Sequence, residues 1–141
     1  MRIVLDTNIV LSALLWRGTP HQLLVAIGAQ SNIQIYSSAA LLGELADVLT
    51  RPWAAQRLAV IGRTAGAVLA DYIEVTELVE PDSVPRVVPG DADDDHVIAA
   101  ALAARADLIV SGDRKHLLPM RSHRGIPIIE AAEALRLISS D

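Results

Sequence analysis

The chain begins with a short aliphatic segment that ends in a carboxylate. The run Ile3–Leu5 contains only β-branched and aliphatic residues, and Asp6 follows it directly. Such a run predicts a strand buried on both faces of a sheet. Open α/β sheets place their chemistry at the C-terminal ends of the strands, which is where Asp6 would lie. The alternative is that Asp6 or Thr7 only caps a helix that starts near Ile9.

The same arrangement recurs late in the chain. Residues 108–110 read Leu-Ile-Val, and Ser111, Gly112 and Asp113 follow. This second aliphatic run also predicts a strand that delivers an aspartate at its end. The recurrence favours a shared site over two unrelated helix caps.

Strands and helices are expected to alternate, which is typical of a parallel sheet covered on both faces. Strands are predicted at residues 2–5, 33–36, 73–78, 108–110 and 126–129. Helices are predicted at residues 9–16, 21–29, 95–104 and 131–137, from a cap at Ser37 or Ser38 to a stop at Pro52, and once or twice within 53–72 with a break near Gly62. A chain of 141 residues is expected to form one domain over residues 1–141.

The composition excludes several kinds of protein. The absence of cysteine rules out disulfide scaffolds, thiolate zinc sites and cysteine nucleophiles. The sequence shows neither a signal peptide nor a transmembrane run, so we expect a cytoplasmic protein without membrane partners. A net charge of −5 argues against broad, nonspecific binding of nucleic acid.

The charges are nevertheless gathered in two places. One is an acidic cluster made of Asp91, Asp93, Asp94 and Asp95. The other is a basic stretch made of Arg114, Lys115, Arg121 and Arg124, together with His116 and His123. Both sets are open to interpretation as ordinary solvated surface. The functional interpretation is an acidic pocket neutralised by a metal ion, beside residues that hold RNA phosphates.

Two further acids are candidates for the same site. Glu44 sits at the edge of a helical stripe of Leu41, Leu45 and Val48, a position that often belongs to a surface residue. Its helix follows a predicted strand, which brings Glu44 to the edge of the sheet that carries Asp6. Asp95 begins a predicted helix, where an acid is also favourable for the helix alone.

The helical register distinguishes the neighbouring acids. Asp95 shares a face with Ile98, Ala99 and Leu102, so it is the acid predicted to point at the sheet edge. Asp94 lies off that face and is the better candidate for an N-cap, while Asp93 points nearly opposite.

Crowded carboxylates raise one another's pKa and cost stability, and a divalent cation removes that cost. The predicted ligands are all oxygen atoms and include no paired histidines, which favours Mg²⁺ or Mn²⁺ over zinc. Metal-assisted hydrolysis of a phosphodiester is the reaction that such a site suits best.

Five segments in this order resemble the PIN domain family. They are residues 4–8 (Val-Leu-Asp-Thr-Asn), a glutamate within 38–49, residues 93–100, residues 110–113 (Val-Ser-Gly-Asp) and residues 125–128. The resemblance is strongest to the small stand-alone PIN proteins of prokaryotes, the VapC-like toxin components of toxin–antitoxin pairs. It implies a three-layer α/β/α sandwich with a mainly parallel central sheet.

The resemblance also implies an activity and its residues. It implies a Mg²⁺- or Mn²⁺-dependent endoribonuclease with RNA as substrate, an antitoxin partner and a homodimer. The acids that match the family's metal-binding and catalytic positions are Asp6, Glu44, Asp95 and Asp113, and Asn8, Ser111 and Asp94 match supporting positions.

Other classes fit less well. A phospho-acceptor receiver domain needs an aspartate after its third strand and a lysine after its fifth, and the only lysine here is Lys115. A catalytically inactive PIN-shaped interaction module remains the alternative to the nuclease. Trp16 and Trp53 are interpreted as core or subunit-interface residues rather than as platforms for bases.

Overall fold

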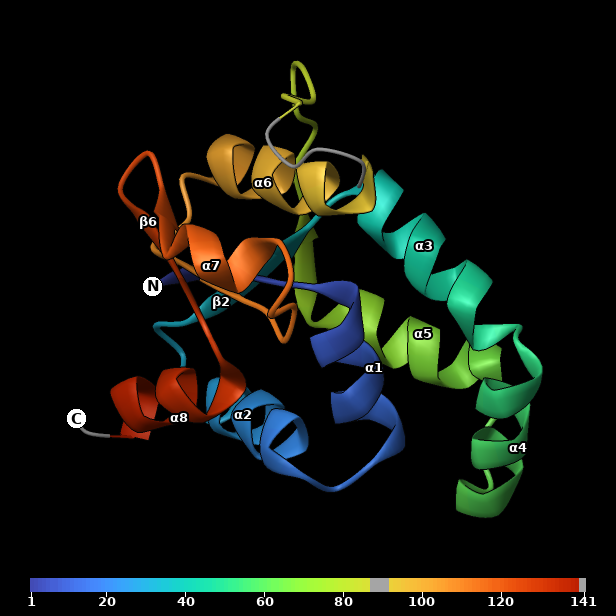
Figure 1. Cartoon of the computed structure of the whole chain (residues 1–141). Helices are drawn as coiled ribbons and strands as arrows, with labels where there is room; N and C mark the ends of the chain where they lie inside the picture. The colour runs from blue at the N-terminus through green and yellow to red at the C-terminus, as the bar shows by residue number, and fades with distance from the viewer. Residues whose placement is uncertain (87–91, 140–141) are drawn as a thin grey trace.

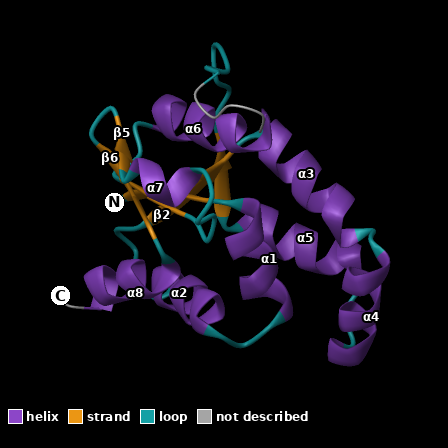
Figure 2. Ribbon diagram, in the orientation of Figure 1, coloured by secondary structure: helices purple, strands orange, loops and turns teal. Residues whose placement is uncertain are grey.

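The computed structural model describes residues 1–86 and 92–139, with the backbone alone for residues 92 and 93. Its described part contains a sheet of six strands in the order β3-β2-β1-β4-β6-β5, with helices on both faces (Figures 1 and 2). The strands are β1 (Arg2–Leu5), β2 (Gln34–Ser37), β3 (Thr76–Leu78), β4 (Leu108–Val110), β5 (Ser122–His123) and β6 (Ile126–Ile129). Only the β5–β6 pair is antiparallel among these strands, so the predicted mainly parallel sheet is confirmed.

The central strand β1 is buried on both faces, as its aliphatic sequence predicts. Ile3 and Leu5 belong to one hydrophobic core and Val4 to the other. Successive side chains of a strand point to opposite faces, so each face of the sheet requires an apolar residue here. Within the sheet, Ile3 pairs with Ile35 on one side and with Leu108 on the other.

The helices form two layers. One core contains residues of α1 (Thr7–Leu15), α2 (Thr19–Gly28), α4 (Pro52–Ile61), α5 (Ala65–Glu74) and α8 (Ala131–Ser139). The other contains residues of α6 (Ala92–Ala104) and α7 (Leu117–Met120). Helix α3 (Ala39–Leu49) contributes to both, because Leu41 packs in the second core and Leu45 in the first. The α/β/α arrangement expected for the chain is thus confirmed.

Local signals set several helix ends. Ser38 caps α3, since its hydroxyl accepts a hydrogen bond from the N–H of Leu41 at 3.3 Å. Helix α3 stops at Leu49, so the predicted stop at Pro52 is wrong. Pro52 is instead the first residue of α4, a position where a backbone N–H would make no hydrogen bond within the helix. Helix α4 ends at Gly62, which adopts φ of +69°.

Two further predicted boundaries are wrong, and two short elements were not predicted. Helix α6 begins at Ala92 rather than at Asp95. Residues 73–75 continue α5 or follow it, so β3 starts only at Thr76. The short elements α7 and β5 were not predicted, because each is too short to carry a periodic pattern.

The described helices include none that is long and apolar enough to cross a membrane.

Gly62 offers a test of the helix terminus. Its N–H donates to Ala59, and the N–H of Arg63 donates to Leu58, which closes α4 in a left-handed turn that disfavours a Cβ. We expect Gly62→Ala to lower the free energy of unfolding by about 1 kcal/mol. Gly43→Ala, inside α3 with no atom within 4 Å of the added Cβ, is the control and should raise it by about 0.5–1 kcal/mol. Urea denaturation measures both changes, and a stabilising Gly62→Ala would contradict this account of the turn.

Candidate metal centre

The C-terminal ends of β1 and β4 lie side by side, as the two aliphatic runs predict. Leu5 pairs with Val110 in parallel register, and the N–H of Asp6 donates to the carbonyl of Val110 at 2.9 Å. The residues that follow each strand therefore emerge at one edge of the sheet. This pairing brings Asp6 close to Ser111 and Asp113.

Ser111 connects the two aspartates. Its hydroxyl donates to Oδ2 of Asp6 at 2.7 Å and accepts a hydrogen bond from the N–H of Asp113 at 3.0 Å. Ser111 is fully buried and Asp6 is 6% exposed. The backbone of Asp6 also begins α1, since its carbonyl accepts from the N–H groups of Ile9 and Val10. Asp6 thus serves as the N-terminal residue of the helix while its carboxylate takes part in the site.

Asp113 is held by the loop that follows it. Its Oδ1 accepts from the N–H of Lys115 at 2.9 Å and of His116 at 3.2 Å, and its Oδ2 accepts from the N–H of Leu117 at 3.3 Å. Burial raises the pKa of the Asp113 carboxyl. These backbone donors and a hydrogen bond with the Asp94 side chain outweigh burial, so the pKa lies below its ordinary value. The carboxylate of Asp113 therefore stays ionised at neutral pH.

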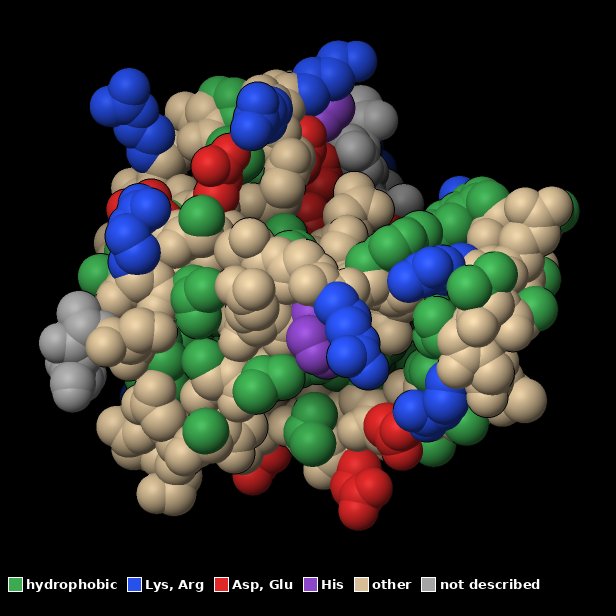
Figure 3. All heavy atoms as spheres, turned by 90° about the horizontal axis from the view of Figure 1, so that it is seen from below, with side chains coloured by type: hydrophobic (Ala, Val, Ile, Leu, Met, Phe, Trp, Pro, Cys, Tyr) green, Lys and Arg blue, Asp and Glu red, His purple; other side chains and the backbone are tan. Residues whose placement is uncertain are grey.

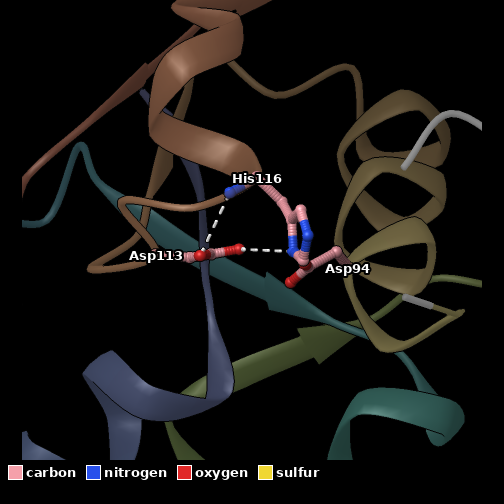
Figure 4. Close-up of side chains that lie close together, drawn as sticks. All are labelled: Asp94, Asp113 and His116. Carbon is pink, nitrogen blue, oxygen red and sulfur yellow. Dashed lines mark hydrogen bonds and ion pairs between the residues drawn. The ribbon is translucent and has the colours of Figure 1, made fainter. Parts of the chain in front are cut away.

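Asp94, Asp113 and His116 form a compact cluster. Nδ1 of His116 lies 3.3 Å from Oδ2 of Asp94 and 3.7 Å from Oδ2 of Asp113. Figure 4 shows Asp113 on the loop after β4 and Asp94 on α6, with the His116 ring between them. One ligand atom from each residue lies within 4.8 Å of the other two.

The early start of α6 explains why Asp94 joins this cluster. Asp94 lies in the first turn of α6 and is buried with Val97 and Ile98, three and four residues later. The prediction that Asp94 is the N-cap of this helix is therefore wrong. Asp95 is buried as well, at 6% exposure, because α6 is apolar on nearly all sides and packs deeply against the sheet. The side chain of Asp93 lies outside the described residues.

Glu44 and Asn8 line a neighbouring groove of about 470 Å³. Helix α1 supplies Asn8 and α3 supplies Glu44, while His96 of α6 completes this end. Asp47, Arg51 and Trp53 line the groove as well. The acids predicted for one site are thus divided: Asp94 and Asp113 belong to the cluster, Ser111 links Asp6 to it, and Glu44 lines the groove.

The basic stretch is dispersed. Arg114 is exposed and lies 3.4 Å from Glu130, Lys115 is exposed in the loop after Asp113, and Arg121 is exposed at the end of α7. Arg124 instead lines a hollow with Glu80 and Asp82 beside the far part of α6. On the face that Figure 3 shows, the Lys and Arg side chains in general are scattered among other residues.

His116 is the member of the cluster that the sequence interpretation missed as a ligand. It was assigned to the basic stretch because neighbouring residues carry positive charge. The available signal was its spacing, since a histidine three residues after Asp113 shares one side of a helical turn with it.

The donor atoms of this cluster fit a divalent metal ion. Asp94 and Asp113 each offer a carboxylate oxygen within 4.8 Å of the other, which crowds negative charge when both are ionised. A cation relieves that crowding. Carboxylate oxygens suit Mg²⁺ and Mn²⁺, and an imidazole nitrogen favours transition metals such as Mn²⁺ over Mg²⁺.

Comparisons with known proteins agree with this geometry. A family model described as PIN domain matches residues 2–115. Among solved structures, the chain is similar to one in the crystal structure of VapBC2 from Rickettsia felis bound to a DNA fragment from their promoter. That match has a TM-score of 0.63 and 14% sequence identity, and it covers 92% of this chain and 98% of the other. No match was found among curated proteins.

Ser111 is expected to stabilise the fold as well as the site. Ser111→Ala removes the donor to Asp6 and the acceptor for Asp113, and it leaves a buried carboxylate with one hydrogen bond fewer. We expect a loss of about 2 kcal/mol in the free energy of unfolding at neutral pH, measured by urea denaturation without metal. The exposed Ser31→Ala is the control and should change it by less than about 0.5 kcal/mol. Equal stability of the two variants would mean that the Ser111 bridge contributes little.

Proposed function

Because the chain belongs to the PIN domain family, we propose that it is a metal-dependent endoribonuclease that hydrolyses RNA phosphodiester bonds. The observation that carries the proposal is the cluster of Asp94, Asp113 and His116, to which Ser111 links Asp6. We propose that residues 1–141 act as one domain in this role.

Asp6, Asp94, Asp113 and His116 would hold Mg²⁺ or Mn²⁺ in this proposal. Such an ion, when bound, lowers the pKa of a coordinated water and stabilises the leaving oxygen of a phosphodiester. Asp113 offers an ionised carboxylate because the backbone donors keep its pKa low. Glu44 and Asp95 would complete the acidic set, and Asn8 would support it from the groove.

Ser111 has an orienting role. Its hydroxyl donates to Oδ2 of Asp6 and would orient this carboxylate, in the way that hydrogen-bonded partners commonly orient metal ligands. The N–H groups of Lys115 and His116 orient Asp113 similarly. The carboxylates are thus ordered before a metal or a substrate arrives.

The substrate contacts are proposed from charge and position. Arg114 and Lys115 are exposed in the loop after Asp113 and Arg121 at the end of α7, so they would contact phosphates beside the scissile bond. Arg124 would contact a more distant phosphate, since it lies beside α6 with Glu80 and Asp82.

The biological setting follows from the same resemblance. The Rickettsia felis structure contains VapBC2 on promoter DNA, and the motifs of this chain resemble small prokaryotic toxin components. We therefore propose a cytoplasmic toxin that forms a homodimer and binds a cognate antitoxin protein.

Cleavage of RNA is the direct test of the activity. We expect the purified protein to cut RNA with Mn²⁺ or Mg²⁺ and to lose all activity in EDTA. Asp6→Asn should lower turnover by about 100-fold or more, because it removes a ligand charge while keeping the side-chain shape. Gel-resolved cleavage of a labelled RNA gives the rate, and circular dichroism shows whether the variant is folded. Full activity in EDTA, or wild-type turnover by Asp6→Asn, would refute the metal mechanism; no cleavage under any condition would favour the interaction module.

The two acids of α6 can be separated by metal binding. We expect Asp94→Asn to weaken Mn²⁺ binding by about tenfold or more, because Asp94 contacts Asp113 and His116. Asp95→Asn is the matched control, one residue away and equally buried, and its loss should be smaller. Calorimetric titration with Mn²⁺ measures both. A larger loss in Asp95→Asn would return the ligand role to Asp95, as the helical register alone predicts.

A further inference from the structure

Two tryptophans stack against each other at the surface. Trp16 follows the end of α1 and Trp53 lies at the start of α4, with ring centroids 6.2 Å apart and an interplanar angle of 18°. Trp16 is 42% exposed and Trp53 is 43% exposed, so of the two predicted places, core or subunit interface, the core is wrong. Two large apolar rings kept partly in water are typical of a surface that another molecule covers.

The pair is held in a fixed position. Arg57 lies one helical turn after Trp53 on α4, and its Nε donates to the carbonyl of Leu15 at 2.7 Å. The guanidinium carbon of Arg57 also lies 5.3 Å from the centre of the Trp16 ring. Arg57 therefore ties α4 to the end of α1 and fixes Trp16 beside Trp53. A surface that is ordered before binding loses less conformational entropy when its ligand arrives.

Trp53 lines the groove that contains Asn8 and Glu44. The groove therefore runs from the neighbourhood of the metal centre to the tryptophan pair. Trp16 lines a separate hollow, together with Arg17, His21 and Arg57. The side of the stack that adjoins the acidic groove thus belongs to Trp53.

The charges of the groove favour a base over a phosphate at Trp53. Glu44 and Asp47 are acidic, and Arg51 lies 3.8 Å from Asp47, which offsets its charge. Phosphates are repelled from such walls, whereas the flat face of a base is uncharged and stacks on an indole. Every base has such a face, so this contact selects unpaired bases rather than a sequence.

We propose that Trp53 stacks an unpaired base of the RNA substrate a few nucleotides from the scissile bond, and that Trp16 and Arg57 position Trp53 for this contact. The proposal rests on the proposed ribonuclease function and adds that the substrate is single-stranded on this side of the site.

Binding of RNA tests the stacking contact without turnover. In the Asp6→Asn background, we expect Trp53→Ala to weaken binding of a short fluorescein-labelled single-stranded RNA about tenfold, measured by anisotropy. Trp53→Phe should recover most of the affinity, because a smaller aromatic ring still stacks. Val60→Ala is the control on the same helix, since Val60 is 75% exposed and lies outside the groove, and it should bind as the parent does. A duplex of the same sequence should be insensitive to Trp53→Ala.

Kinetics in the otherwise wild-type protein distinguish the two levels of the proposal. Trp53→Ala should raise KM about tenfold while kcat changes less than about twofold, because the contact lies away from the reacting bond. Normal cleavage and unchanged RNA affinity in Trp53→Ala would overturn the stacking role and leave the ribonuclease intact. If single-stranded RNA binds in a way that depends on Trp53 but the wild type does not cleave it, the ribonuclease function would be overturned and the stacking role kept.

The competing occupant is a second copy of the chain. Light scattering at several concentrations measures the oligomeric state of the wild type and Trp53→Ala. A dimer that dissociates in Trp53→Ala, with RNA affinity unchanged, would assign the pair to a subunit interface and overturn the proposal. An unchanged oligomeric state together with the loss of RNA affinity supports it.

Discussion

The parallel pairing of β1 with β4 brings Asp6 and Asp113 of the candidate site to the same edge of the sheet. Because Leu5 faces Val110 in the ladder, the residues after both strands leave the sheet at the same height. The hydrogen bond from the N–H of Asp6 to Val110 extends this pairing by one residue beyond β1. A shift of one residue would exchange the two faces of β1, moving Val4 into the wrong core. The hydrophobic pattern that stabilises the fold therefore also fixes the positions of Asp6 and Asp113 relative to each other.

Crowding of acids at this edge opposes stability, and the surrounding residues offset part of it. Ser111 donates to Asp6, backbone N–H groups donate to Asp113, and the His116 ring lies between Asp113 and Asp94. These groups keep the carboxylates ordered and, at Asp113, ionised. An arrangement that only served the fold would use apolar residues at such buried positions, as the rest of the sheet does. This contrast is the physical reason to regard the edge as a functional site.

The sequence predicts the long periodic elements well and the short irregular ones poorly. Aliphatic runs identify β1 and β4 because both strands are buried on two faces, which leaves little freedom in residue type. The start of α6 was predicted three residues too late, because this helix is apolar on nearly every side and no single face marks its beginning. Arg121 ends α7 and Arg124 follows β5, and both residues adopt positive φ. An arginine in the sequence gives no sign of this conformation, so the two elements cannot be predicted. His116 lies in a different irregular segment, the loop between β4 and α7, where no periodic pattern points to a ligand.

Helices α1 and α3, which both begin near the acidic edge of the sheet, connect that edge to the groove and the tryptophan pair. Helix α1 follows Asp6 and ends before Trp16, while α3 carries Glu44 and leads to Trp53 through the turn before α4. The nine residues of α1 span about 14 Å. At about 3.4 Å per stacked nucleotide, that length corresponds to roughly four nucleotides between the acids and the far end of the helix. One end of the groove thus concentrates charge and the other presents aromatic surface. A bound RNA strand would place a phosphate at the acidic end, where a metal ion would contact it, and a base at the tryptophan end, where it would stack on the ring.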